Sequence, residues 1–99
     1  MPLEFATAEI SFSNVRGTQR GTRTVSFNTP VVAAETAVQG FNFDFVSGDN
    51  NIDRAQVRTR RVRTAGNDVE VEATVIYADR LRDDDYNASV NVLVIAQTT

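Results

Sequence analysis

Branched side chains arranged with a period of two restrict the fold of this chain more than any other feature. The chain contains 14 valines and 11 threonines but only three leucines. β-Branched residues crowd a helix and fit the pleated surface of a strand. No segment shows a convincing helical period, so the sequence predicts an all-β protein.

Turn residues divide the alternating segments into six predicted strands. We predict strands over residues 3–12, 22–28, 37–46, 52–64, 68–77 and 88–97. Residues 13–21, 47–51 and 78–87 are polar and are predicted as loops, with a bend at Thr29-Pro30. A chain of 99 residues is too short for two separate cores. The prediction is therefore an all-β, six-stranded antiparallel β-sandwich with residues 1–99 as a single domain.

The strand faces and their pairing can also be predicted. Ala37, Phe41, Phe43 and Phe45 alternate on one face of the third strand and are expected in the core, and the turn after them predicts a hairpin to the fourth strand. The sixth strand is apolar on both faces, which indicates either a central strand or an outer face that meets a partner.

The Gly66-Asn67 dipeptide predicts a two-residue hairpin turn between the fourth and fifth strands. Counting outward from this turn gives the pairs Ala65/Asp68, Thr64/Val69, Arg63/Glu70, Val62/Val71 and Arg61/Glu72. A bulge near Arg60 and Arg61 would return Val57 to the core.

The charges exclude several partners. All ten basic residues are arginine, and 13 acidic residues give a net charge of -3. A net negative protein is a poor ligand for polyanions, so we expect no nucleic-acid partner. The five arginines from Arg54 to Arg63 allow a phosphate-binding stripe, but pairing with Glu70 and Glu72 is the better interpretation. No apolar run is long enough to insert into a membrane and the N-terminus lacks a signal-peptide pattern, so we expect a soluble chain of unknown localisation.

The chain has no histidine and no cysteine. It therefore lacks the side chains of most hydrolases and zinc sites, and we expect no enzyme activity, no cofactor and no metal. Two alternatives remain open. One is an acid/base pair formed among Asp44, Asp79 and Asp85, and the other is calcium binding by the segments 49–53 and 83–85, which carry oxygen ligands of the kind that calcium takes.

One short segment combines groups that sugar sites use. Tyr77-Ala78-Asp79-Arg80, at the end of the fifth strand, supplies a ring, a carboxylate and a guanidinium. An aromatic face stacks on a sugar, and the charged groups bond its hydroxyls. The alternative is a strand end with solvated charges.

The order of several features resembles the H-type lectin domain. These features are the segment from Thr24 to Pro30, the strand from Phe41 to Phe45, the Asp/Asn turn, an arginine-bearing strand and the ending Val94-Ile95-Ala96. The resemblance covers about three quarters of the chain. It implies a six-stranded sandwich that assembles as trimers or hexamers and binds galactose or N-acetylgalactosamine.

The resemblance also implies where the glycan is bound. The family's binding arginine would correspond to Arg54 or Arg58, and its aromatic contact would fall near Tyr77. Together with Asp79, these residues form the expected carbohydrate site of a homo-oligomer, most simply a trimer. The alternative function is a structural or assembly subunit of a phage or secretion particle without a small-molecule ligand.

Overall fold

The computed structural model describes residues 2–46, 54–78 and 85–99, and all regular structure in them is β-strand. The strands are β1 (Leu3–Val15), β2 (Thr18–Ser26), β3 (Val31–Phe45), β4 (Arg54–Ala65), β5 (Asp68–Ala78) and β6 (Tyr86–Thr98). Every pairing between them is antiparallel. The predicted all-β class and the six strands are confirmed.

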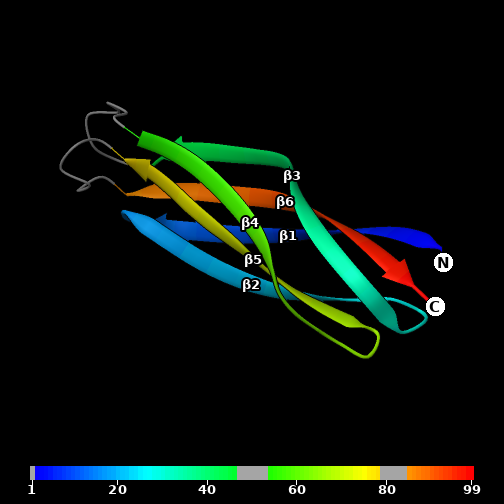
Figure 1. The fold of residues 1–99 in the computed structure, drawn as a ribbon. Coiled ribbons are helices and arrows are strands. Elements are labelled where there is room, and N and C mark those ends of the chain that lie inside the picture. The colour runs from blue at the N-terminus through cyan, green and yellow to red at the C-terminus, as the bar shows by residue number, and fades with distance from the viewer. Residues whose placement is uncertain (1, 47–53, 79–84) are drawn as a thin grey trace.

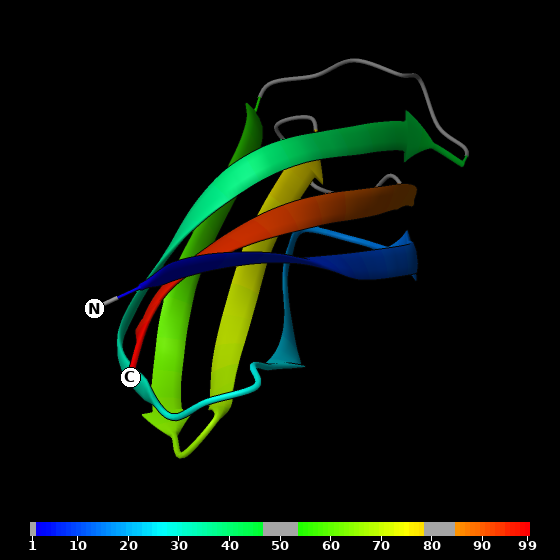
Figure 2. The ribbon, with the colours of Figure 1, turned by 90° about the vertical axis from the view of Figure 1, so that its right-hand side faces the viewer.

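The strands form two three-stranded sheets, ordered β1-β6-β3 and β2-β5-β4, which pack face to face as a sandwich (Figures 1 and 2). Both termini lie at the same end of the sandwich (Figure 1). At this end the Thr98 backbone amide donates a hydrogen bond to the Pro2 carbonyl at 3.1 Å. The chain changes sheet at each connection except the β4–β5 hairpin. The predicted hairpin between the third and fourth strands is therefore wrong, because turn residues show that the chain reverses but not which sheet it enters.

The core lies between the two central strands, β5 and β6. Their inward side chains alternate with partly exposed ones, and the fully buried ones include Val69, Val71, Ala73, Val75, Tyr86, Val90, Val92, Val94 and Ala96. Burying one valine side chain contributes roughly 1.5–3 kcal/mol. The sixth strand is thus central, one of the two alternatives that its sequence left open.

Residues 13–21 are not the predicted loop. β1 continues to Val15 and β2 begins at Thr18, with a turn at Gly17 whose φ is +63°. β2 is an edge strand, and its outward side chains stay in solvent. A polar run is therefore compatible with a strand here. Tyr86 and Asn87, also predicted in a loop, are the first residues of β6.

A register shift between Val38 and Gly40 changes the faces of β3. Before the shift Ala37 pairs with Leu93 on the outer face, whereas beyond it Phe41 pairs with the buried Val90. Ala37 therefore does not share a face with the phenylalanines. Phe43 and Phe45 pack on the core as predicted, whereas Phe41, on the same edge strand, is 61% exposed. The expectation that Ala37 and Phe41 belong to the core is wrong.

The β4–β5 hairpin follows the predicted register for its first three pairs, from Ala65/Asp68 to Arg63/Glu70. Gly66 adopts φ +58° in the turn, as a glycine there permits. A register shift then leaves Val62 without a partner, so the next pairs are Arg61/Val71 and Arg60/Glu72. The predicted Val62/Val71 and Arg61/Glu72 pairs are wrong. The bulge exists, slightly closer to the turn than expected, and Val57 packs on the core.

Gly21 of β2 faces the side chains of β1 in the opposite sheet at close range. A Cβ atom there would lie 2.8 Å from Cγ2 of Ile10, which is buried. We expect Gly21→Val to lower the free energy of unfolding by about 1–3 kcal/mol, because an overpacked core must shift its backbone or its rotamers. Urea denaturation measures this change. Gly40→Ala is the control, since its Cβ would meet nothing closer than 3.8 Å; an equal loss in both variants would contradict the explanation.

Candidate functional site

Tyr77 is part of an aromatic cluster between the sheets. Its ring stacks on Phe43 at 4.7 Å and on Phe45 at 4.5 Å between centroids, and it meets the edge of Tyr86 at 6.1 Å. Tyr77 itself is half-buried. Its ring is therefore engaged with core side chains rather than presented to solvent.

The other expected site residues do not gather around Tyr77. Arg54 pairs with Ala78 and Arg58 with Thr74, which places both arginines on the outer face of the β2-β5-β4 sheet. Tyr77 lies on the inner face of that sheet. Asp79 lies outside the described residues. Of the four expected residues, the structure thus separates Tyr77 from the two arginines.

The outer face of β2-β5-β4 is polar and carries a hollow of about 410 Å³, which we call the arginine hollow. It is lined by Arg20, Arg58, Thr59, Arg60, Glu72 and Thr74. Arg20, Thr74 and Arg58 form one row across the three strands, because Thr74 pairs with both arginines. This row was not predictable from the sequence, since Arg20 lay in a predicted loop.

Ion pairs occupy the two rows next to the Arg20–Thr74–Arg58 row, and the nearer pair, Arg60 with Glu72, also lines the arginine hollow. Arg60 Nε lies 2.9 Å from Glu72 Oε1, and Arg63 Nε lies 3.4 Å from Glu70 Oε1. With the Gln56 amide oriented so that its oxygen faces Arg58, that oxygen accepts hydrogen bonds from Arg58 Nε and Nη2 at 2.8 Å. The paired strand charges expected from the sequence are therefore present, but Arg58 pairs with a neutral amide.

A second hollow lies at the open edge between β3 and β4. This Phe41 groove measures about 230 Å³ and is lined by Val38, Phe41, Phe43, Ala55, Gln56 and Val57. The Phe41 ring contacts Phe43 with centroids 5.6 Å apart, and Phe43 stacks in turn on Tyr77. Gln56 belongs to the groove and bonds Arg58, so it connects the groove with the arginine hollow. The sequence singled out Phe41 only as one of three alternating phenylalanines. That pattern predicted a buried ring, whereas the ring is exposed.

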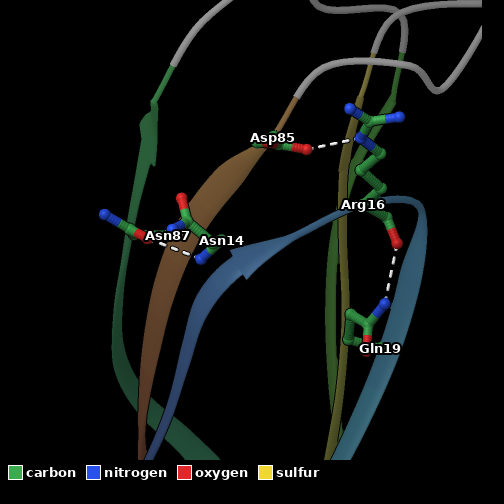
Figure 3. A network of polar contacts seen from close by, with 5 residues as sticks. All are labelled: Asn14, Arg16, Gln19, Asp85 and Asn87. Carbon is green, nitrogen blue, oxygen red and sulfur yellow. Dashed lines mark hydrogen bonds and ion pairs between the residues drawn. The ribbon is translucent and has the colours of Figure 1, made fainter.

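The turn between β1 and β2 is held by polar contacts to the start of β6 (Figure 3). The Asn14 backbone N–H donates a hydrogen bond to Asn87 Oδ1 at 2.9 Å, and the Arg16 guanidinium forms an ion pair with the Asp85 carboxylate. Gln19 Nε2 donates to the Arg16 carbonyl at 2.7 Å (Figure 3). These groups satisfy one another, so they fix the turn in place.

Tyr86 holds the same turn from inside the sandwich. Its ring is fully buried and its hydroxyl donates to the Gly17 carbonyl at 2.6 Å. Burial raises the pKa of the Tyr86 phenol, since a charged phenolate would be poorly solvated there. The phenol therefore stays protonated as a donor across the physiological range, and its role is structural.

The outer face of the β1-β6-β3 sheet carries several apolar side chains towards the termini, beside Gln97 and Glu35. Leu3 and Phe5 of β1 are 61% and 64% exposed, and Phe5 pairs with Ile95 on this face. Leu93, which pairs with both Thr7 and Ala37, continues the surface across β6. We call Leu3, Phe5, Leu93 and Ile95 the apolar face. Contiguous exposed apolar surface of this kind is typical of interaction sites.

The candidate metal and acid/base sites can be located only in part. Residues 49–53 and Asp83 and Asp84 lie outside the described residues, while Asp85 pairs with Arg16. In the described part of the chain, no group of three or more metal-ligating side chains comes together. Within the same residues, no helix is long and apolar enough to cross a membrane.

Comparison of the chain with family models, curated proteins and solved structures gives no match in any of the three. The resemblance to H-type lectins therefore rests on the residue pattern alone.

Proposed function

We propose that this chain is a carbohydrate-binding module without catalytic activity, which binds a galactose or N-acetylgalactosamine type of sugar in the Phe41 groove. The observation that carries the proposal is an exposed aromatic ring beside a polar pair. Phe41 is 61% exposed, and Gln56, which lines the same groove, is bonded to Arg58. No metal or cofactor is required for such binding.

The groove offers both kinds of contact that a neutral sugar needs. The apolar face of a pyranose ring stacks on an aromatic side chain, and a few placed donors and acceptors fix its hydroxyls. Phe41 supplies the ring. Gln56 supplies an amide. Arg58 lines the neighbouring arginine hollow, is bonded to that amide, and supplies guanidinium donors that no carboxylate among the described residues uses.

Tyr77 takes a positioning role in this proposal. It stacks on Phe43, and Phe43 contacts Phe41. Tyr77 therefore supports the groove from the core and is not the ring that the sugar meets. Arg58 keeps the part expected from the sequence, whereas Arg54 does not line either hollow.

We further propose that the module acts as a homo-oligomer joined through the apolar face, with a trimer or hexamer as the arrangement implied by the lectin resemblance. A single shallow groove binds weakly because it covers little of the sugar. When several copies are joined in one oligomer, their weak sites bind a surface with repeated sugars together, and the apparent affinity rises.

We expect Phe41→Ala to weaken monosaccharide binding at least tenfold, because the loss of one stacked ring costs about 1.5 kcal/mol or more. Titration of galactose and N-acetylgalactosamine followed by NMR measures the dissociation constant. Phe5→Ala is the matched control, since Phe5 is equally exposed but lies outside the groove. Equal sugar affinity in Phe41→Ala and in the parent protein would show that the sugar site is elsewhere.

A second candidate function is that of an assembly subunit with no small-molecule ligand. The exposed Leu3 and Phe5 favour it, because a particle subunit needs only a surface for its neighbours. A broad glycan array separates the two functions. An oligomeric protein that retains no glycan on the array supports the assembly function and contradicts the lectin proposal.

A further inference from the structure

We propose that the arginine hollow is a binding site for a tetrahedral oxyanion, such as a sulfate ester or a phosphate monoester. This site is distinct from the Phe41 groove, although Arg58 lies next to both. It goes beyond the neutral sugar proposed above and does not depend on that proposal.

The row of Arg20, Thr74 and Arg58 is the basis of the inference. The two arginines are in register on either side of the central strand, with the Thr74 hydroxyl between them. Neighbouring strands lie about 4.8 Å apart, so the backbones of the two arginines are roughly 10 Å apart. Both side chains line the same hollow. The row therefore offers two guanidinium forks and one hydroxyl to a group seated above the strand.

The charge balance in this row differs from that of its neighbours. The next rows towards the hairpin turn contain Glu72 and Glu70, which pair with Arg60 and Arg63. The central position of the Arg20 row holds a threonine instead of a glutamate. Among the described residues, neither Arg20 nor Arg58 forms an ion pair with a carboxylate. The row thus has two positive charges and no negative charge of its own.

The donors fit a tetrahedral anion. An esterified sulfate or phosphate exposes three oxygens, and guanidinium groups bind such oxygens in pairs. Two arginines and one hydroxyl supply donors to all three. The hollow of about 410 Å³ leaves space for the group that carries the ester.

The net charge of the protein limits the size of the ligand. The whole chain carries -3, but the lining of the hollow holds three arginines against one glutamate. A small anion interacts mainly with charges within a Debye length of about 8–10 Å. A long polyanion also interacts with the negative charges on the rest of the surface. The site therefore suits a single ester group and not a nucleic acid.

Titration with inorganic sulfate and inorganic phosphate, with chloride as the reference anion, tests the inference by NMR. We expect saturable amide shifts around Arg20, Arg58 and Thr74, and affinity that falls as ionic strength rises. Arg20→Gln should weaken sulfate binding roughly tenfold to a hundredfold, since a hydrogen bond to a charged group contributes about 1.5–3 kcal/mol. Arg20 does not line the Phe41 groove, so this variant should bind galactose as the parent does.

The matched control is Arg63→Gln, which removes the same charge from the same face but from an arginine paired with Glu70. It should retain sulfate binding. Absence of saturable sulfate and phosphate shifts, or equal losses in Arg20→Gln and Arg63→Gln, would overturn the inference.

Galactose and galactose-6-sulfate form a further arm of the experiment. Sulfate binding without any galactose binding would support the oxyanion site while contradicting the proposed sugar groove. Galactose binding without sulfate or phosphate binding would support the Phe41 groove as a sugar site and contradict the oxyanion site. If galactose-6-sulfate binds more tightly than galactose and more tightly than inorganic sulfate, both sites are supported and the ligand is a sulfated sugar. If the natural ligand is a free sulfate or phosphate ion, galactose-6-sulfate should bind no more tightly than inorganic sulfate.

Discussion

Replacing Tyr77 with alanine is expected to lower the free energy of unfolding by about 3–5 kcal/mol, which is the usual cost of removing a large aromatic side chain from a core. The ring stacks on Phe43 and Phe45 and meets the edge of Tyr86. These contacts join the two sheets, because Phe43 and Phe45 come from β3 and Tyr77 comes from β5. Urea denaturation followed by fluorescence or circular dichroism measures the loss.

Tyr77→Phe keeps the stacked ring and is the control. It should cost less than about 1.5 kcal/mol and leave sugar affinity within a factor of a few of the parent. Unchanged stability in Tyr77→Ala combined with lost sugar binding would contradict the positioning role. It would instead support direct contact between Tyr77 and the sugar.

If the proposed oligomer forms through the apolar face, replacing Phe5 with aspartate is expected to dissociate it. Phe5 is 64% exposed on the apolar face, and an ionised carboxylate in a contact between copies would be buried without a partner. Burial of an unpaired polar group costs roughly 3 kcal/mol or more, so the association constant should fall at least about a hundredfold. The molecular mass measured by light scattering after gel filtration should be a multiple of 10.9 kDa for the parent protein and 10.9 kDa for the variant.

Ser11→Asp is the matched control for this variant. Ser11 lies on the same strand and the same outer face as Phe5, but it is paired with Ser89 in the polar part of that face. It should leave the oligomer intact. A parent protein that is monomeric at micromolar concentration would contradict the oligomer proposal and remove the avidity on which the lectin function depends.

Local features of the fold were predictable from the sequence, and long-range features were not. The Gly66 turn fixed the first three pairs of the β4–β5 hairpin because they are close in sequence and coupled by charge. The extra residue at Val62 then shifted every later pair by one. A bulge has no reliable sequence signal, because it depends on how the whole sheet must twist over the opposite one.

Sheet membership was not predictable for the same reason. Residues that turn the chain do not reveal whether the next strand joins the same sheet or crosses to the other. β3 and β4 therefore appeared as a hairpin, although they lie in opposite sheets and touch only through side chains such as the hydroxyls of Thr36 and Thr59, 3.0 Å apart.

The candidate site shows how burial limits prediction of function. Tyr77 and Phe41 both lie on predicted strands, and nothing in the sequence tells which ring the opposite sheet covers. The structure covers Tyr77 with Phe43 and Phe45 and leaves Phe41 exposed at the edge. Arg58 was named from the sequence because the lectin resemblance places a binding arginine on this strand. Arg20 was not, because an edge strand with polar outward residues resembles a loop.

The most direct test of the proposed function is a map of the amide and aromatic NMR shifts of the parent protein during titration with galactose and N-acetylgalactosamine. We predict saturable shifts that centre on Phe41, Gln56 and Arg58, with no shifts at Phe5 on the apolar face. Saturable shifts centred elsewhere, or no shifts with either sugar, would contradict the proposal that the Phe41 groove binds carbohydrate.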